Sequence, residues 1–491
     1  RDYYASRGLG DVYKRQIMAL TADEEAKVKQ IITAFNNGKR LNELPVADGS
    51  NPFDFITEVL DKTGESKQAG LAAMLPYAED QCSYGVELDV TVSSPVLTRT
   101  GNVTLHKTLP IQSKMRGCLL SDAGTVVEYL NPTNWKAHQL DGSNGMVMVE
   151  IPAHWRRFYT NGNKRGVRIS EYPLPGYSFV NKCYISAYEA TVQRSTGKLA
   201  SVVNTATDYR GGSNQADWDA LPKSQLGKPA TNMSRTSFRT AARKRGTTEW
   251  NCMDYNAYIT LAWLYYIEYA NLNSQAAFNA QKDANGYSQG GLGNGVTTWD
   301  GTSWSNFNGY YPVIPCGTTD ELGNGSGEVA YSLLNADGST LKTFTANRYR
   351  GIENPFGHVW KWTDGMNMEV KTDANGGTSK VYVATDPANY NDSNYNGYTF
   401  RGLAARTEAY AKEMIFGEYG DLIPCVVGGS STTYWCDYYY TYKNENRMQG
   451  VLFGGTTNDG DPAGFGYANT ADASSTASAT VGSRLCFIPK A

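Results

Sequence analysis

The stretch that decides the fold is RYRGIENPFGHVWKWTDG, residues 348–365. Within it Trp360 and Trp362 stand two positions apart, and side chains two apart on a strand point to the same face. We therefore expect both tryptophans to be buried, with their shared face turned toward the core. Leu485 and Phe487, close to the end of the chain, are also expected to be buried.

The composition of the 491-residue chain is that of a folded protein, with 41% hydrophobic and 19% charged residues. The net charge is −3, so no global basic field favours nucleic acid as a partner. No run of about 18 apolar residues is present, so we expect no insertion into a membrane. Only 4 histidines occur, which argues against a histidine-built metal site, and we expect no cofactor.

Eight cysteines are scattered along the chain. They form no Cys-x-x-Cys pair of the kind that binds zinc. We expect buried free thiols, with one or two disulfide bridges as the alternative.

The beginning of the chain differs from the rest. Residues 1–17 resemble a translated sequencing adaptor rather than natural protein, so we expect the natural start at Met18. Residues 18–80 show helical spacing and no signal peptide, which predicts an N-terminal helical region.

Strand patterns begin after this region. Residues 84–92 alternate apolar and polar side chains, and residues 118–130 predict a hairpin. We therefore predict a small β region over 81–145, which serves in anchoring or oligomerisation. Aromatic residues and long loops become dense from Met146 onward, so residues 146–491 are expected to form one domain.

That domain has one strong helical pattern, over 254–272, and its aromatic stripe is expected to pack in the core. Before it lies the basic run SRTSFRTAARKRG, residues 234–246. A nucleic-acid surface is one interpretation of this run. A solvated or internally paired helix face is favoured, because the rest of the domain is acidic to neutral.

The segment over residues 430–480 has the most unusual composition, with more than half of it Tyr, Gly, Asn, Ser and Thr. Antibody paratopes share this bias, because tyrosine gives rigid contact area and small polar residues hydrogen-bond adaptably. Residues 434–440, YWCDYYY, would place aromatic rings on both faces of a strand. One face can be core, and the other either binds a partner or belongs to an aromatic edge strand of an ordinary domain.

Two motifs carry a family resemblance. GHVWKW, residues 357–362, resembles the "G-N-V-W-E-W" signature of the formylglycine-generating-enzyme type of C-type lectin fold, and VGSRLCF, residues 481–487, resembles its terminal "G-x-R-x-C" strand. Together with the basic run and the Tyr-rich segment, their order resembles variable proteins of diversity-generating retroelements in gut phages and prophages. The resemblance implies an α+β fold of the C-type lectin class with long irregular loops.

The resemblance also implies a function. In that family a reverse transcriptase writes adenine-directed errors into a C-terminal variable repeat, here expected over 430–487, and the phage members are tail receptor-binding proteins. The implied partners are a host cell-surface receptor, protein or glycan, other tail proteins, and copies of the same chain, with a trimer plausible. The implied location is the virion, or the bacterial cytoplasm before assembly.

Carried over to this chain, the resemblance implies a constant frame around Cys436, 450–455, Gly464 and 482–487. The residues interleaved with it are expected to converge on one solvent-facing, ligand-binding patch. They are Trp435, Asp437, Tyr439, Tyr442, Asn458, Asp459, Asp461, Phe465, Tyr467, Asn469 and Asp472.

Three alternatives remain beside the binding function. Formylglycine-type oxidation needs two thiolates close together, and the corresponding segment holds Cys436 alone, so we expect no enzyme of this kind. A phage-borne glycan hydrolase would need two carboxylates in a cleft, and no pair stands out. A purely structural tail protein would bind no ligand.

Overall fold

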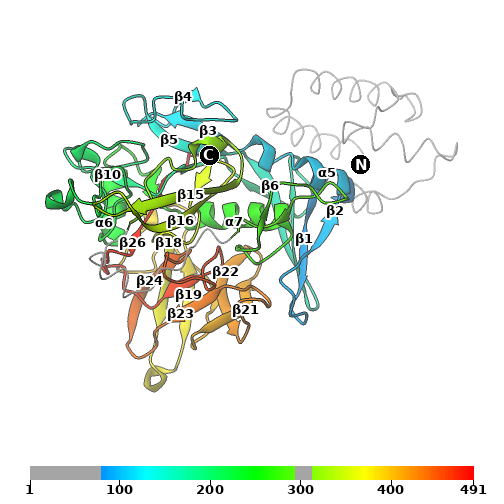
Figure 1. The fold of residues 1–491 in the computed structure, drawn as a ribbon. Coiled ribbons are helices and arrows are strands. Elements are labelled where there is room, and N and C mark those ends of the chain that lie inside the picture. The colour runs from blue at the N-terminus through cyan, green and yellow to red at the C-terminus, as the bar shows by residue number, and fades with distance from the viewer. Residues whose placement is uncertain (1–78, 294–311, 491) are drawn as a thin grey trace, which may run out of the picture. The chain divides into compact units, whose positions relative to one another are not determined.

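The computed structural model describes residues 79–293 and 312–490, drawn as a ribbon in Figure 1. The expectations for residues 1–78, the adaptor-like start and most of the N-terminal helical region, lie outside the described residues. From Ser83 onward the chain forms one compact unit that is mostly β with few helices. The mixed α+β class is confirmed at that level, and the assignment to the C-type lectin class stays a prediction.

The largest sheet has nine strands and contains most of the C-terminal part of the chain. Eight of them are ordered β20 (Thr399–Leu403), β19 (Ser379–Val383), β18 (Trp360–Val370), β24 (Arg447–Phe453), β25 (Ala468–Thr470), β23 (Tyr438–Thr441), β21 (Ala409–Phe416) and β22 (Asp421–Val427). The ninth, β26 (Val481–Gly482), pairs in parallel with the start of β18.

Two further sheets join the early strands to later ones. The six-stranded sheet is ordered β12 (Trp250–Cys252), β27 (Leu485–Phe487), β9 (Cys183–Ser186), β5 (Met146–Ile151), β3 (Arg116–Leu120) and β4 (Val126–Tyr129). The five-stranded sheet is ordered β2 (Thr98–Gly101), β1 (Tyr84–Asp89), β7 (Lys164–Ser170), β6 (His154–Asn161) and β8 (Ser178–Val180).

Smaller elements complete the described chain. A three-stranded sheet contains β15 (Gly327–Leu334), β16 (Thr340–Tyr349) and β17 (Ile352–Glu353). Two-stranded ribbons pair β10 (Thr191–Gln193) with β11 (Lys198–Ala200) and β13 (Phe278–Asn279) with β14 (Gln289–Gly290). The α-helices are α5 (Val103–Thr108), α6 (Arg235–Arg243) and α7 (Tyr255–Tyr269). Short 3₁₀ turns are η3 (Gln112–Lys114), η4 (Thr207–Tyr209), η5 (Ala216–Trp218), η6 (Asp320–Leu322), η7 (Asp373–Asn375) and η8 (Pro387–Asn389). No helix within the described ranges has the length and apolar character needed to cross a membrane.

The predicted boundary between residues 145 and 146 is not a boundary between two units. β1 pairs with β7 along its whole length, and β3 pairs with both β4 and β5. The strand at 84–89 and the hairpin around residue 123 are present as predicted, but each also hydrogen-bonds with a strand that lies at or beyond residue 146. The small β region over 81–145 is therefore part of the same folded unit as the rest.

Helix α7 runs through the middle of this unit (Figure 1) and is buried on all sides. It begins because the side chain of Asp254 caps it, accepting a hydrogen bond from the N–H of Ala257 at 2.9 Å. Several of its tyrosine hydroxyls donate to acceptors inside the protein, as Tyr258 does to the Phe465 carbonyl at 2.7 Å. The aromatic stripe predicted for the core is confirmed, since a helix that is apolar all round belongs inside a protein.

The tryptophans of the fold-deciding stretch lie at the start of β18, and both are buried as predicted. The Trp362 ring packs so closely on Gly450 that a Cβ there would lie 2.6 Å from it, so glycine is required at this position. Leu485 and Phe487 are likewise buried in β27, where the Phe487 ring lies 4.9 Å from that of Trp250. These contacts fix the C-terminal strands against the core.

The basic helix α6 turns two arginines into the protein. Nε and Nη2 of Arg239 donate to the two carboxylate oxygens of Asp364 at 2.6 and 2.8 Å, and Nη1 donates to Asp392 at 2.6 Å. Arg235, one turn earlier, donates to Asp392 and to the Met366 carbonyl at 2.7 and 2.6 Å. Burial alone would raise the pKa of Asp392, but the two guanidinium charges lower it overall. The run is internally paired, one of the two arrangements favoured from the sequence.

Replacing Arg239 by Met should lower the free energy of unfolding by about 3–5 kcal/mol, because it leaves the buried Asp364 charge with one arginine fewer. Urea unfolding followed by tryptophan fluorescence measures this loss. The matched control is Arg406→Met, whose partner Asp373 is exposed, and which should leave the unfolding midpoint nearly unchanged. Equal losses for the two variants would contradict the assignment.

Candidate ligand-binding face

The structure buries five of the eleven residues predicted to face a ligand. Their exposed fractions are at most 1%: Trp435, Asp437, Tyr439, Phe465 and Tyr467. Trp360, expected to be the better buried, is 7% exposed. The prediction that these five residues form a solvent-facing patch is therefore wrong.

The prediction for Tyr439 was wrong because it assigned this residue to the outward face of its strand. β23 alternates, so Tyr439 points inward, where its hydroxyl lies 2.9 Å from that of Thr470. Tyr438 and Tyr440 point to the opposite face, and Tyr440 is 36% exposed. A shift of one residue exchanges the two faces of a strand completely. The sequence places aromatic residues at both parities, so it carried no signal for choosing between them.

Trp435 and Phe465 belong to the core around α7. The Trp435 ring lies 6.0 Å from that of Trp263 and 5.8 Å from that of Tyr266. Phe465 lies 4.9 Å from Tyr265. These are edge-on and tilted contacts of the kind that stabilise aromatic cores, so both residues belong to the core rather than to a ligand-facing surface.

Asp437 is a buried carboxyl beside these rings. It accepts a hydrogen bond from the N–H of Gly466 at 2.7 Å. Gly464 approaches it so closely that a Cβ would lie 2.0 Å from Oδ1, which accounts for glycine there. Burial raises the pKa of Asp437 well above its ordinary value, which favours the protonated form.

The other six predicted residues remain at or near the surface. Tyr442, Asn458 and Asp461 are exposed, and Asp459, Asn469 and Asp472 are half-buried. Two of them, Asn469 and Asp472, contact each other, and Asn469 lies beside Tyr440. Asn469 pairs with it across β25 and β23, and the amide of Asn469 donates to Asp472 at 3.0 Å.

A row of tyrosines, absent from the predicted set, covers the outer face of β21 and β23. The centroids of Tyr410 and Tyr438 are 5.2 Å apart, and those of Tyr438 and Tyr440 are 5.1 Å apart. Behind them Tyr467 lies 5.9 Å from Tyr440 and 4.5 Å from Trp360. We call Tyr410, Tyr438 and Tyr440 the tyrosine ladder.

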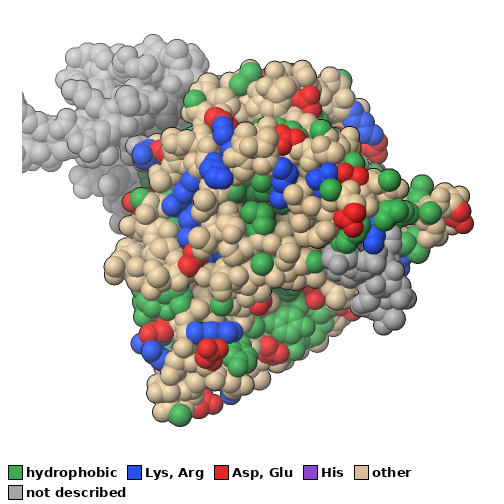
Figure 2. Space-filling view, turned by 90° about the vertical axis from the view of Figure 1, so that its left-hand side faces the viewer, with side chains coloured by type: hydrophobic (Ala, Val, Ile, Leu, Met, Phe, Trp, Pro, Cys, Tyr) green, Lys and Arg blue, Asp and Glu red, His purple; other side chains and the backbone are tan. Residues whose placement is uncertain are grey.

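Polar groups border the tyrosine ladder. The hydroxyl of buried Tyr467 donates to Asp459 at 3.3 Å, which ties the loop carrying Asn458 and Asp461 to the ladder. Burial raises the pKa of Asp459. Figure 2 shows side chains of the hydrophobic class, in which it includes tyrosine, reaching the surface between polar ones low on the face drawn.

Neither a metal centre nor a thiolate pair is evident in this region. Within residues 79–293 and 312–490, no group of three His, Cys, Asp or Glu side chains is placed to hold a metal ion. All eight cysteines are free, and burial raises the pKa of the Cys436 thiol to about 12. Cys436 is therefore a protonated core residue, with the properties of a small apolar side chain.

Comparison with known proteins finds only weak similarity to solved structures. No family model and no curated protein matches the chain. Among solved structures it is similar to "Major Tropism Determinant U1 Variant", with 10% identity and a TM-score of 0.20 over 68% of this chain and 72% of that one. The "Major Tropism Determinant M1 Variant" gives 10% identity and a TM-score of 0.21 over 69% and 73%. Such scores do not establish a shared fold, so the function is argued from the chain's own residues.

Replacing Asp437 by Asn should raise the thermal unfolding midpoint at about pH 8 and flatten its dependence on pH. Burial favours the protonated form of Asp437 in the folded protein, whereas the unfolded chain, with a carboxyl pKa near about 4, releases the proton. The stability linked to this proton is complete below the unfolded pKa and is lost as pH rises toward the folded one.

Thermal melts of the wild type and Asp437→Asn between about pH 5 and 8 test this linkage. Asp461→Asn, an exposed carboxyl nearby, is the control and should follow the wild-type curve. A gap between the wild type and Asp437→Asn that stays constant with pH would show that Asp437 is ionised in the folded protein.

Proposed function

We propose that this chain is a phage tail-type receptor-binding protein and that the tyrosine ladder forms part of its receptor-binding face. The observation that carries the proposal is the outer side of β23, where Tyr438 and Tyr440 stand in a row of rings beside adaptable polar residues. Tyrosine provides large contact area at a small cost in conformational entropy. Exposed aromatic groups of this kind mark interaction sites more often than catalytic ones.

The finer part of the proposal is that a retroelement diversifies this face. Substitutions are tolerated where a side chain points outward, since surface changes usually alter stability by less than about 0.5 kcal/mol. The exposed members of the C-terminal segment meet this condition. They include Tyr440, Tyr442, Asn458 and Asp461, and Tyr438 and Asn469 are half-buried.

The partners follow from the same proposal. The receptor is a protein or glycan of the host cell surface, and the chain is carried on the virion beside other tail proteins. Several copies, a trimer in the simplest case, would convert weak single contacts into firm attachment. Anchoring or oligomerisation by residues before 146 remains part of the proposal.

Replacing Tyr440 by Ala should weaken attachment to receptor-bearing cells by about 1–3 kcal/mol, because it removes an exposed anchor from the tyrosine ladder. Fluorescently labelled protein and flow cytometry on a panel of intact gut bacterial isolates measure attachment. Tyr129→Ala removes a comparably exposed tyrosine from β4 and should leave attachment unchanged.

Tyr439→Ala is the complementary variant. It should cost about 3–5 kcal/mol of stability, as truncation of a buried aromatic does. Full attachment by a folded Tyr440→Ala protein, together with Tyr438→Ala behaving the same way, would remove the tyrosine ladder from the receptor-binding face.

The retroelement makes a separate prediction about DNA. A reverse-transcriptase gene and a near-copy of the segment encoding residues 430–487 should lie nearby, with mismatches at adenines of the copy. Across related loci the mismatches should change codons for Tyr440, Tyr442 and Asn458. The codons for Trp435 and Tyr439 should stay constant, because both side chains are buried. Sequencing the locus decides this, and variation at the buried codons would contradict it.

A further inference from the structure

A pocket of about 590 Å³ lies away from the tyrosine ladder. Its walls come from β6, β8, the start of α7, β20 and the turn between β21 and β22, and no residue of the ladder lines it. This volume suits a small molecule, since such sites enclose roughly 300–1,000 Å³. The proposed receptor-binding face makes no use of the pocket, so its chemistry calls for a separate account.

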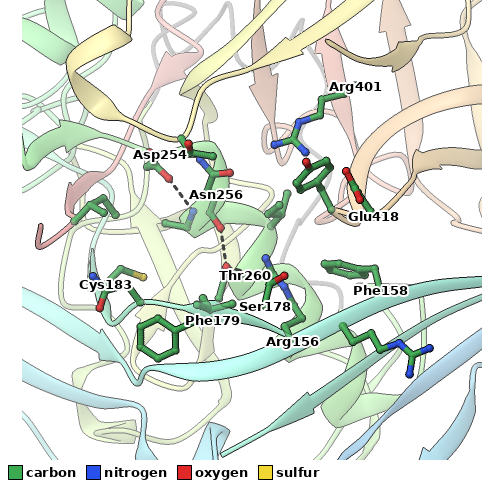
Figure 3. A pocket seen from close by; sticks show the side chains of 18 of the residues that line it. Arg156, Phe158, Ser178, Phe179, Cys183, Asp254, Asn256, Thr260, Arg401 and Glu418 are labelled. Atoms are coloured by element: carbon green, nitrogen blue, oxygen red, sulfur yellow. Dashed lines mark hydrogen bonds between the residues drawn. The ribbon is translucent and has the colours of Figure 1, made fainter. Parts of the chain in front are cut away.

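Two arginines give the pocket its character. Figure 3 shows the guanidinium groups of Arg156 and Arg401 both turned toward its middle. Each is stacked on an aromatic ring: Arg401 lies 3.2 Å from the centroid of Tyr419, and Arg156 lies 4.8 Å from that of Phe158. Stacking fixes the plane of a guanidinium and leaves its edge, with the N–H donors, free to bind an anion.

The donors of these arginines are incompletely used. Nη1 of Arg156 donates to the Thr260 hydroxyl at 3.1 Å. Nε and Nη1 of Arg401 are buried and have no hydrogen-bond partner among the residues that the structure describes. A buried guanidinium donor without an acceptor is costly, and a carboxylate is the acceptor that matches its fork geometry.

The acids around the arginines do not cancel their charge by direct pairing. Asp421, whose charge acts on both arginines, instead accepts a hydrogen bond from the Tyr255 hydroxyl at 3.0 Å. Burial raises the pKa of Asp421 to about 6, so its carboxyl is still mostly ionised at neutral pH and takes up a proton only as the pH falls below that value. Burial lowers the pKa of Arg156 to about 10, which still leaves it charged.

The remaining walls combine ring faces and neutral polar groups with a third arginine, Arg157, and two carboxyl side chains, Asp254 and Glu418. The Asp254 carboxylate is engaged in capping α7. Phe179 presents an apolar surface that is 55% exposed, beside Ser178. The amides of Asn181 and Asn256 and the hydroxyl of Thr385 provide further donors and acceptors. Ring faces and hydroxyl-binding groups around a carboxylate-binding pair are complementary to a carboxylated sugar ring.

We propose that this pocket binds an acidic sugar residue, whose carboxylate is held between the guanidinium groups of Arg156 and Arg401. The sugar hydroxyls face the amide and hydroxyl side chains, and its apolar face lies against the aromatic wall. This site is independent of the tyrosine ladder. Attachment through one of them can be lost without the other.

Isothermal titration calorimetry of the full chain with glucuronic, galacturonic and N-acetylneuraminic acids tests the proposal. Glucose and galactose are the neutral counterparts, and acetate and phosphate are the simple anions. At least one acidic sugar should bind about tenfold more tightly than every neutral sugar and simple anion, as a charge-assisted, shape-selective site requires. Equal heats for acidic and neutral sugars, or for acetate, overturn the proposal with wild-type protein alone.

Variants then locate the site. Arg401→Gln should weaken binding of the acidic sugar about tenfold or more, because it removes one charged donor group. Arg165→Gln, which removes an arginine that donates only to the backbone carbonyls of Gly162 and Lys164, should bind normally. Tyr440→Ala should also bind normally. Unchanged binding by a folded Arg401→Gln variant would place the sugar elsewhere and refute the assignment.

Discussion

The buried ion-pair network around Asp364 is the constraint on which the rest of this structure depends. Asp364 lies in the central strand β18, receives two hydrogen bonds from Arg239 of α6, and donates its own N–H to the Met253 carbonyl just before α7. Two buried charges are tolerated only in a geometry that satisfies both. The network therefore sets the positions of both helices against the large sheet, and the strands that carry the tyrosine ladder are built outward from it.

Strand β23 is buried on one side only, so the C-terminal segment contributes side chains both to the core and to the surface. Tyr439 and Thr441 of β23 point inward, while Tyr438 and Tyr440 point outward. The inward side chains pack with the neighbouring strands and with the rings around α7, so their shapes are constrained. The outward ones contact each other, Tyr410 and the buried Tyr467, and Tyr440 reaches solvent. Under the proposed function, the outward side chains could be replaced with a smaller loss of stability than Tyr439 or Thr441, because they are less buried.

The sequence predicted features that depend on local spacing. The two-residue spacing of Trp360 and Trp362 predicted their burial, and the stripe of α7 predicted a core helix. Features that depend on distant partners were not predicted. β1 pairs with β7 and β3 pairs with β5, although the composition of the sequence suggested that these strands belong to different regions. Which side chains of β23 face inward depends on its pairing with β21 and β25. The arginine pocket, likewise, collects its walls from segments more than two hundred residues apart.

The distribution of arginine illustrates why composition is a weak guide to surface chemistry in this chain. The basic run of α6 suggests an anion-binding surface. In the structure, however, Arg235 forms an ion pair with Asp392, and Arg239 forms one with Asp364. Arg401 and Arg156 stand in unremarkable stretches of sequence, yet their guanidinium groups reach a pocket, where both are stacked on rings and two donors of Arg401 have no acceptor. What separates the two pairs is direct pairing with a carboxylate, which only the fold determines. A guanidinium already held by two carboxylates cannot recognise an anion, whereas one that is oriented but unpaired is ready to do so.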